Sequence, residues 1–334
     1  MKKLCILLAL LLCLSSFTAC GAVRAYSSSF YLMNTPIGVT LYTTSQKKAD
    51  EIFSACEELL AEMERLWARQ KPESEIARFN QSLEGIDGIN ARTVALLKTA
   101  LDVSAATEGA FDITVTPLVE LWALCERENR LPTAAELEAT LQLVDSSALL
   151  VGESALTKSN PDVSIDLGGI GKGAAISHLI DYLESTDARG GLVSFGSNVA
   201  VFGEKPDGAA FRVAIKHPRL AGERVGTLTM PVGSVLSVSG DYERYVTIDG
   251  VRYHHILDPA TGYPAASGLA SVAVLTEDGA LADALSTALF VMGEARARSF
   301  YEAGIYSFEA IFIDTEGNAR YTDGIADIFS LEET

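Results

Sequence analysis

Residues 164–175 read SIDLGGIGKGAA, and this stretch indicates how the chain is organised. Its first four residues alternate polar and apolar, a glycine turn follows, and small residues then favour a helix. A strand, a tight turn and a helix start are therefore predicted here. The helix start would present amide N–H groups to an anion. Gly169, Gly171 and Ala174 match a dinucleotide-binding pattern, but a turn without any ligand explains the same letters.

The segments around this stretch do not show the regular strand–helix alternation of a dinucleotide-binding fold. Patterns with helical periodicity cover residues 46–67, 92–109, 131–144, 173–186 and 279–293. Short strand-like runs cover residues 30–43 (as a pair), 162–167, 190–195, 198–203, 211–217, 226–232, 235–240, 244–257 and 269–276. We therefore expect an α+β fold with mixed or antiparallel sheets and packed helices in two interlocked lobes. No linker rich in proline or serine interrupts residues 30–330, so we expect a single domain there.

The first twenty residues predict a targeting segment. Lys2 and Lys3 precede an apolar run, residues 4–14, that is too short to span a bilayer. Small residues then lead to Cys20, as in a bacterial lipoprotein signal. We expect a signal peptide over residues 1–19, and a lipidated Cys20 with a short linker over residues 20–29. The mature protein would be anchored outside the cytoplasmic membrane by its acyl chains. Ordinary secretion with cleavage near Ala19 is the alternative.

Charge and cysteine content narrow the functional classes. The formal net charge of −18 argues against a general nucleic-acid binder, because such a protein needs a basic surface. An anionic small ligand remains compatible, since one local lysine or metal ion can outweigh the distant field. Only Cys56 and Cys125 lie beyond Cys20. They either pair in an oxidising compartment or remain as two unlinked buried thiols.

Two further patterns carry candidate chemistry. Asp283 and Thr287 lie four residues apart in a predicted helix, so both oxygens can face one hard cation such as Mg²⁺. Ordinary helix capping and backbone bonding explain this pair as well. Residues 252–264, RYHHILDPATGYP, place His254 and His255 before a stiff turn. Adjacent side chains of an extended segment face opposite ways, so only one of these histidines can point into a site.

In this order the segments resemble the ApbE family of FAD:protein FMN transferases. The resemblance rests on EGAFDITVTPLVELW (residues 108–122), SIDLGGIGKGAA, SGDYERYVTIDGVRYHHILDPATGYP (residues 239–264) and ADALSTALFVMG (residues 282–293), with SEIARFN (residues 74–80) in support. It implies a T-fold-like α+β architecture and an extracytoplasmic enzyme that uses Mg²⁺ to split FAD. FMN would pass to a threonine hydroxyl of a target flavoprotein, and AMP would leave.

The resemblance also implies roles for individual residues. The metal ligands would be the Asp283 carboxylate, the Thr287 hydroxyl and the Gly169 carbonyl. The FAD site would be lined by Ala110, Phe111, Asp112, Asp166, Lys172 and the backbone near Ile256. His255 would be the catalytic base and Lys172 would offset phosphate charge. Asp258 would either orient the imidazole or fix the turn.

The alternative functions differ in the chemical groups that they require. A flavin-binding lipoprotein would need the ring and phosphate contacts but neither the Asp283–Thr287 pair nor His255. An Mg²⁺-dependent FAD pyrophosphatase would use the same site with water as the nucleophile. A dehydrogenase is a third possibility that rests on the glycine pattern alone.

Overall fold

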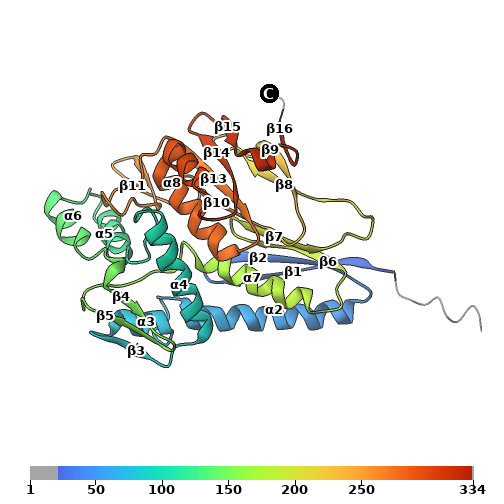
Figure 1. The fold of residues 1–334 in the computed structure, drawn as a ribbon, viewed down its shortest axis with the longest axis horizontal. Coiled ribbons are helices and arrows are strands. Elements are labelled where there is room, and N and C mark those ends of the chain that lie inside the picture. Colours follow the sequence, from blue (N-terminus) through green and yellow to red (C-terminus); the bar gives the residue numbers. More distant parts are fainter. Residues whose placement is uncertain (1–21, 333–334) are drawn as a thin grey trace, which may run out of the picture.

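The computed structural model describes residues 22–332, so Cys20 and the predicted signal peptide lie outside the described residues. Its centre is an eight-stranded sheet in the order β1-β2-β6-β7-β10-β13-β14-β15, in which all neighbouring strands are antiparallel (Figure 1). The strands of this sheet are β1 (Arg24–Leu32), β2 (Thr35–Thr43), β6 (Gly190–Phe195), β7 (Asn198–Gly203), β10 (Val235–Gly240), β13 (Leu269–Thr276), β14 (Glu309–Asp314) and β15 (Ala319–Tyr321).

Three small sheets complete the described strands. They are β16-β9-β8 (Phe329–Leu331, Arg224–Met230, Phe211–Lys216), β3-β5-β4 (Gly85–Asp87, Ala155–Lys158, Leu149–Val151) and the hairpin of β11 (Tyr245–Ile248) and β12 (Val251–His254). The α-helices are α2 (Gln46–Trp67), α3 (Glu75–Gln81), α4 (Ala91–Ala106), α5 (Thr116–Arg127), α6 (Ala134–Leu141), α7 (Gly171–Glu184) and α8 (Gly279–Glu302). Two 3₁₀ turns, η2 (Ser146–Ala148) and η3 (Asp323–Ile325), are also present.

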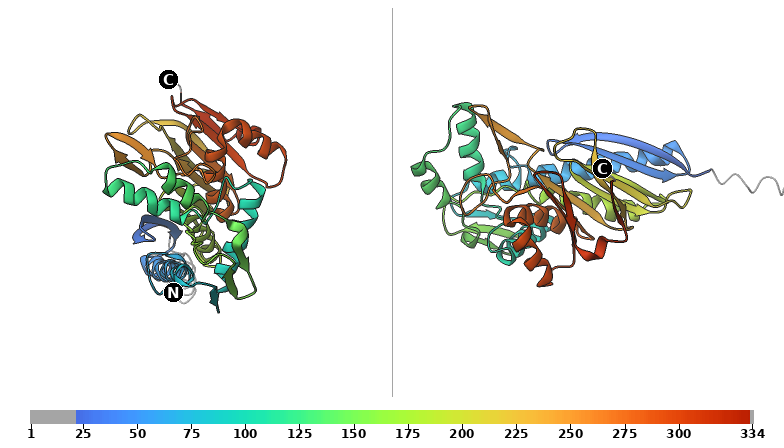
Figure 2. Two further views of the ribbon diagram at one scale, coloured as in Figure 1. Left: turned by 90° about the vertical axis from the view of Figure 1, so that its left-hand side faces the viewer. Right: turned by 90° about the horizontal axis from the view of Figure 1, so that it is seen from above.

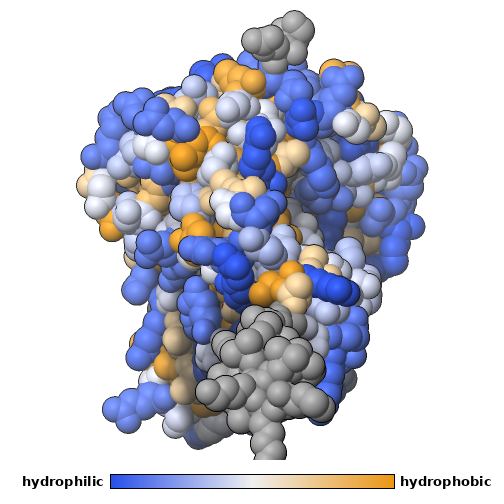
Figure 3. Space-filling model, turned by 90° about the vertical axis from the view of Figure 1, so that its right-hand side faces the viewer, coloured by the Kyte–Doolittle hydropathy of each residue, from blue (hydrophilic) through white to orange (hydrophobic). Residues whose placement is uncertain are grey.

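The central sheet is covered on both faces. Helices α2, α7 and α8 pack on one face and share the main apolar core with the sheet (Figures 1 and 2). The β16-β9-β8 sheet packs through a second apolar cluster on the opposite face. A third cluster joins α5 and α6 to the β11–β12 hairpin at one end of the molecule. The face in Figure 3 is largely hydrophilic with scattered hydrophobic side chains, and within residues 22–332 no helix is both long and apolar enough to cross a membrane.

Much of the predicted local structure is confirmed. Helix α2 covers the predicted residues 46–67, and its apolar stripe is buried. The hairpin turn at Asp249–Gly250 has both residues at positive φ, as its sequence predicts. Thr133 caps α6 in a capping box with Glu136. Cys56 and Cys125 are buried free thiols, which excludes the alternative of a disulfide between them in this structure.

Three expectations about local structure are wrong. Residues 162–167 are not a strand, because their polar groups bond elsewhere: the Asn80 side chain bonds both backbone groups of Ile165, and the Asp166 N–H donates to the Ile113 carbonyl. The predicted linker over residues 20–29 is strand β1 from Arg24 onward. The last predicted helix does not end at residue 293, since α8 continues beyond a kink at Gly293, where φ is 74°.

Helices α7 and α8 touch through their backbones. A Cβ atom on Gly173 would lie 1.8 Å from the Gly279 carbonyl oxygen, and one on Gly279 would lie 2.2 Å from the Gly173 oxygen. Only glycine fits at both positions. This contact sets the N-terminus of α7 beside the first turns of α8, where Asp283 and Thr287 lie.

Candidate functional site

Asp283 lies at the centre of a buried group of oxygen atoms between α8 and β10. Its side chain accepts hydrogen bonds from the Gly173 N–H (3.0 Å) and the Ser237 hydroxyl (3.2 Å). The Lys172 ammonium lies 3.4 Å from the same carboxylate. The residue is only 4% exposed, so these partners offset the cost of removing a charge from water.

Thr287 lies one helical turn further along α8. Its hydroxyl is 3.2 Å from the Ser239 hydroxyl, which in turn lies 2.8 Å from Ser286 Oγ. We call the side chains of Ser237, Ser239, Asp283, Ser286 and Thr287 the oxygen cluster. All its polar side-chain atoms are oxygens, the ligand type that hard cations prefer.

The glycine turn approaches this cluster from α7. A Cβ atom on Gly169 would lie 3.8 Å from Thr287 Oγ1 and 3.1 Å from the Phe111 ring. Phe111 is buried and packs against the turn, and Ala110 before it is buried as well. The structure thus brings Gly169, Phe111 and Thr287 together.

Lys172 and the start of α7 form the positive side of the site. Lys172 Nζ donates to the Gly168 carbonyl at 2.7 Å, which folds the side chain back over the turn. The N-cap residue Ile170 makes no side-chain cap, but the Gly171 N–H donates to the Leu167 carbonyl and the Gly173 N–H to Asp283, so the Lys172 N–H is the first-turn amide without an acceptor among the described residues.

Asp166 and Asp112 line the approach to the turn. Asp166 accepts from the Gly168 N–H (2.7 Å) and from Arg69 Nε (2.5 Å). Arg69 also bonds Glu120 on α5, so it links the end of α2 to this approach. Asp112 accepts from the backbone and the hydroxyl of Thr114, and only one of its two oxygens makes these bonds.

His255 stands opposite this positive side with one ring nitrogen bonded. Its Nδ1 lies 3.0 Å from the Arg244 carbonyl oxygen, which also accepts the His255 backbone N–H. A carbonyl can only accept, so Nδ1 carries the proton and Nε2 keeps a free lone pair. The pKa of His255 is lowered to about 4, chiefly because surrounding protein atoms desolvate the ring and also because of the positive charges of Arg244 and Lys172. His255 is nevertheless exposed to solvent.

His254 faces the protein interior. Its ring meets Phe290 of α8 edge-on at 5.4 Å, and its Nε2 lies 3.2 Å from the Ala265 carbonyl. Burial lowers its pKa as well. The two adjacent rings therefore have different surroundings, as the extended backbone predicts.

The turn after the histidines is closed by Asp258. Its carboxylate accepts from the Ala260 N–H and the Thr261 hydroxyl, and its backbone pairs with Tyr263. Within residues 22–332 Asp258 makes no hydrogen bond to His255, whose Nδ1 is held by Arg244 instead. Of the two roles considered for Asp258, these contacts favour fixing the turn. Trp122 Nε1 donates to the Gly262 carbonyl at 2.7 Å and joins the turn to α5. Ile256 is buried in the main core, and its carbonyl accepts from Ala265.

Four polar partners were missed from sequence: Arg69, Ser237, Ser239 and Arg244. Ser237 and Ser239 occur at alternate positions of a strand otherwise rich in valine, and that pattern could have identified them. Arg69 and Arg244 lie in segments with no distinguishing pattern, and their contacts depend on the tertiary fold.

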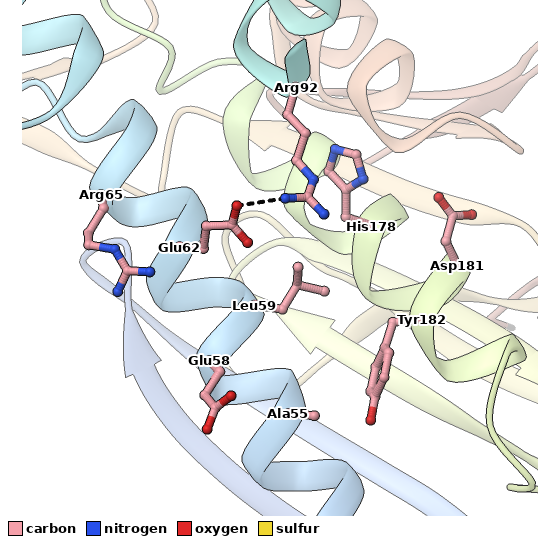
Figure 4. A pocket seen from close by; sticks show the side chains of 9 residues that line it. All are labelled: Ala55, Glu58, Leu59, Glu62, Arg65, Arg92, His178, Asp181 and Tyr182. Atoms are coloured by element: carbon pink, nitrogen blue, oxygen red, sulfur yellow. Dashed lines mark hydrogen bonds and ion pairs between the residues drawn. The ribbon is translucent and has the colours of Figure 1, made fainter. Parts of the chain in front are cut away.

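A separate cavity of about 630 Å³ lies away from these residues, between α2 and α7 (Figure 4). Ala55, Leu59 and Tyr182 line it, and the Glu62–Arg92 ion pair at 2.7 Å lies at its edge. None of the predicted site residues borders it. Within residues 22–332 no group of three or more His, Cys, Asp or Glu side chains could hold a metal, which is compatible with a site of one carboxylate, a hydroxyl and a carbonyl.

With this geometry in hand, comparisons with known proteins identify the family. The model of the ApbE family matches residues 33–312, and the chain belongs to this family. A Vibrio cholerae protein named FAD:protein FMN transferase is 35% identical over 248 residues, which cover 73% of this chain and 74% of that protein. A Haemophilus influenzae protein of the same name is 32% identical over 267 residues, covering 77% and 76%.

Solved structures agree. The flavin transferase ApbE from Vibrio cholerae has a TM-score of 0.80 at 29% identity, with 92% of this chain and 99% of that chain covered. The ApbE protein from Thermotoga maritima has a TM-score of 0.82 at 31% identity, covering 91% and 99%. The predicted family and the predicted α+β fold are both confirmed.

Proposed function

We propose that this protein is an Mg²⁺-dependent FAD:protein FMN transferase whose acceptor is a threonine hydroxyl. The observation that carries the proposal is the meeting of the oxygen cluster, the start of α7 and Lys172, whose charge acts on His255. The Nε2 of His255 makes no hydrogen bond to any residue that the structure describes. The names of the relatives support the same activity. The transferase is therefore preferred to a passive flavin carrier, for which a cation site and a base would have no use.

In the proposed reaction the threonine oxygen attacks the phosphorus on the FMN side of the pyrophosphate. The bond from that phosphorus to the bridging oxygen breaks, and AMP leaves with the bridging oxygen. The hydroxyl proton passes to Nε2 of His255. A hydroxyl is a weak nucleophile at neutral pH, so a positioned base is needed.

The donor set fits Mg²⁺. The Asp283 carboxylate, the Thr287 hydroxyl and the Gly169 carbonyl would each offer an oxygen atom, and the buried Asp283 would supply negative charge. Such a set suits a small hard cation that completes its shell with phosphate and water. When bound, the ion would supply Lewis-acid stabilisation of the pyrophosphate charge.

Lys172 and α7 hold the phosphates in this proposal. Lys172 is anchored to the Gly168 carbonyl and stays near Asp283, so its charge is fixed before the substrate arrives. Preorganised charge of this kind stabilises a transition state without further rearrangement. Ala110, Phe111, Asp112, Asp166 and the backbone near Ile256 would complete the FAD site.

His255 is suited to act as the base because it is neutral. Its pKa of about 4 leaves the ring unprotonated at neutral pH. Two neighbouring positive charges contribute to this low value, and the negative pyrophosphate of FAD would offset them. Bound FAD would therefore raise the pKa of His255 and strengthen it as a base just when it is needed.

The activity is tested by incubating the protein with FAD, Mg²⁺ and a candidate acceptor flavoprotein. We expect the acceptor to gain the mass of FMN on a threonine, with one AMP released per adduct, and EDTA to stop both. Stable FAD that co-purifies unchanged would indicate a binding protein. AMP and free FMN without any adduct would indicate a pyrophosphatase.

We further propose that the enzyme works outside the cytoplasmic membrane, anchored through lipid on Cys20. The support is the sequence of residues 1–20, with its basic start, apolar run and terminal cysteine. Metabolic labelling with a tritiated fatty acid tests this: wild type should be labelled and Cys20→Ala should not. Equal labelling of both would contradict the anchor.

A further inference from the structure

Strand β8 leaves one edge of the β16-β9-β8 sheet unpaired. It is the terminal strand of this sheet and pairs only with β9. Within residues 22–332, the backbone hydrogen bonds of residues 211–216 run to β9 and to no other segment. An open row of N–H and C=O groups is a ready template for another extended chain.

A small hollow of about 90 Å³, which we call the groove, lies between β8 and the central sheet, where Val199, Leu236 and Val238 also line it. Val213 to Lys216 of β8 form one wall, and the β6–β7 turn at Gly196–Ser197 faces them. Tyr242 and Glu243 also line it. The next residue, Arg244, offers the carbonyl that holds both the backbone and the ring of His255. The segment Tyr242–Arg244 thus links the lining of the groove to the contact that positions His255.

The lining of the groove carries one positive and one negative side chain, Lys216 and Glu243, and the flanking residues Arg212 and Arg244 add positive charge, although the chain carries −18. Arg212 and Lys216 are exposed on β8, and neither forms an ion pair with any residue that the structure describes. Arg244 is likewise outside the described ion pairs, and Glu243 is the single carboxylate among the lining residues. Arg244 donates to the Asn34 carbonyl at 3.5 Å, which leaves Arg212 and Lys216 as the cations without a described ion-pair partner. Such cations in an acidic protein favour an anionic ligand at this place.

We propose that the free edge of β8 is the docking site for the acceptor protein, which adds an extended, acidic segment to this sheet. The inference rests on the proposed function, since a protein substrate is needed to occupy the groove. Edge pairing fixes the register of the segment, and so it sets how far along the groove each of its residues reaches. A threonine downstream of the paired residues can then be delivered to His255 at the end of the groove.

The test uses the acceptor that gains FMN mass and the variants Arg212→Glu and Lys216→Glu. Each reversal should raise the KM for the acceptor about tenfold at low salt, because it turns an attraction into a repulsion. The kcat at saturating acceptor, the Kd for FAD and the mass of the adduct should not change. The residues flanking the modified threonine, read from the same mass spectra, should be rich in Asp and Glu.

Lys98→Glu is the matched control, because Lys98 is exposed on α4 and the substitution makes the same change in net charge. It should leave the KM for the acceptor unaltered. Hydrogen exchange gives a second measurement on the wild type, in which the amides of residues 211–216 should exchange more slowly when the acceptor is present.

Normal acceptor KM in both reversal variants, or unprotected amides at residues 211–216 while transfer proceeds, would overturn the docking site. A neutral or basic flank around the modified threonine would overturn it too. These outcomes differ from failure of the function itself, in which wild-type protein forms no adduct with any acceptor.

Discussion

The oxygen cluster and the turn that carries His255 belong to the same site but are built differently. The oxygen cluster is formed by α8 and β10 in the main core, and its hydroxyls and carboxylate bond one another. His255 stands between a two-stranded hairpin and a surface turn, which are attached through the small cluster around Trp122. The charge-stabilising groups are thus fixed by the core, while the base lies on a peripheral element that an arriving acceptor can reach.

We expect the largest effect from a substitution in the oxygen cluster. Asp283→Asn keeps the size of the side chain but removes its charge, so FMN transfer should fall about a thousandfold. AMP release with FAD and Mg²⁺ measures the loss. Asp278→Asn is the matched control, since Asp278 caps the same helix and asparagine caps equally well. Similar losses in both variants would show that the effect is structural.

A smaller loss is expected on the histidine side. His255→Ala removes the base and should lower transfer about a hundredfold or more, with FAD binding retained. His254→Ala removes only the packing contact with Phe290 and should cost much less activity. Transfer rates and FAD titrations of both variants check this. Equal losses would mean that the roles of the two rings are wrongly assigned.

The pH dependence of kcat/KM tests the role of His255 directly. Only the neutral ring accepts a proton, and the pKa of His255 is lowered to about 4, so kcat/KM for FAD should hold from neutrality down to about 5 and fall below that. Arg244→Leu removes a neighbouring positive charge, which raises the pKa and should move the acid limb to higher pH. An acid limb that stays in place in this variant would count against His255 as the titrating group.

The same shift affects stability with a defined sign. Folding lowers the pKa of His255 from 6.5, so the folded protein binds fewer protons than the unfolded chain between that pH and about 4. Its contribution to stability is present above 6.5 and is lost as the pH falls through this window. The melting temperature of the wild type should therefore fall more steeply than that of His255→Asn as the pH is lowered from 6.5 to about 4. Above pH 6.5 the two melting temperatures should depend on pH in the same way.

The smallest expected effect concerns the anchor of the turn. Trp122→Phe keeps an aromatic ring between Tyr253 and Tyr263 but loses the hydrogen bond to Gly262. We expect about 1 kcal/mol of lost stability and a several-fold lower kcat, with metal affinity unchanged. Thermal unfolding and a Mg²⁺ titration of activity measure these. A lower Mg²⁺ affinity would show that the turn after His255 and the oxygen cluster are coupled.

The sequence predicted those features that depend on residues close together in the chain. The stripe of α2, the hairpin turn at Asp249–Gly250 and the Asp283–Thr287 spacing could all be read from neighbouring residues. Residues 162–167 were misjudged because Asn80, which bonds Ile165, lies 85 residues away in sequence. Arg69 and Arg244 were missed for the same reason, since their contacts follow from the tertiary fold.

The backbone contact between Gly173 and Gly279 determines when the site can form during folding. Asp283 meets the Gly173 N–H only when α7 and α8 are docked, and these two residues lie 110 residues apart in the chain. A refolding molecule cannot bring the Asp283 carboxylate to the Gly173 N–H and to Lys172 before that step. The time at which ligand binding appears during refolding would then report the docking of α7 on α8. This event is separate from the earlier appearance of helical signal.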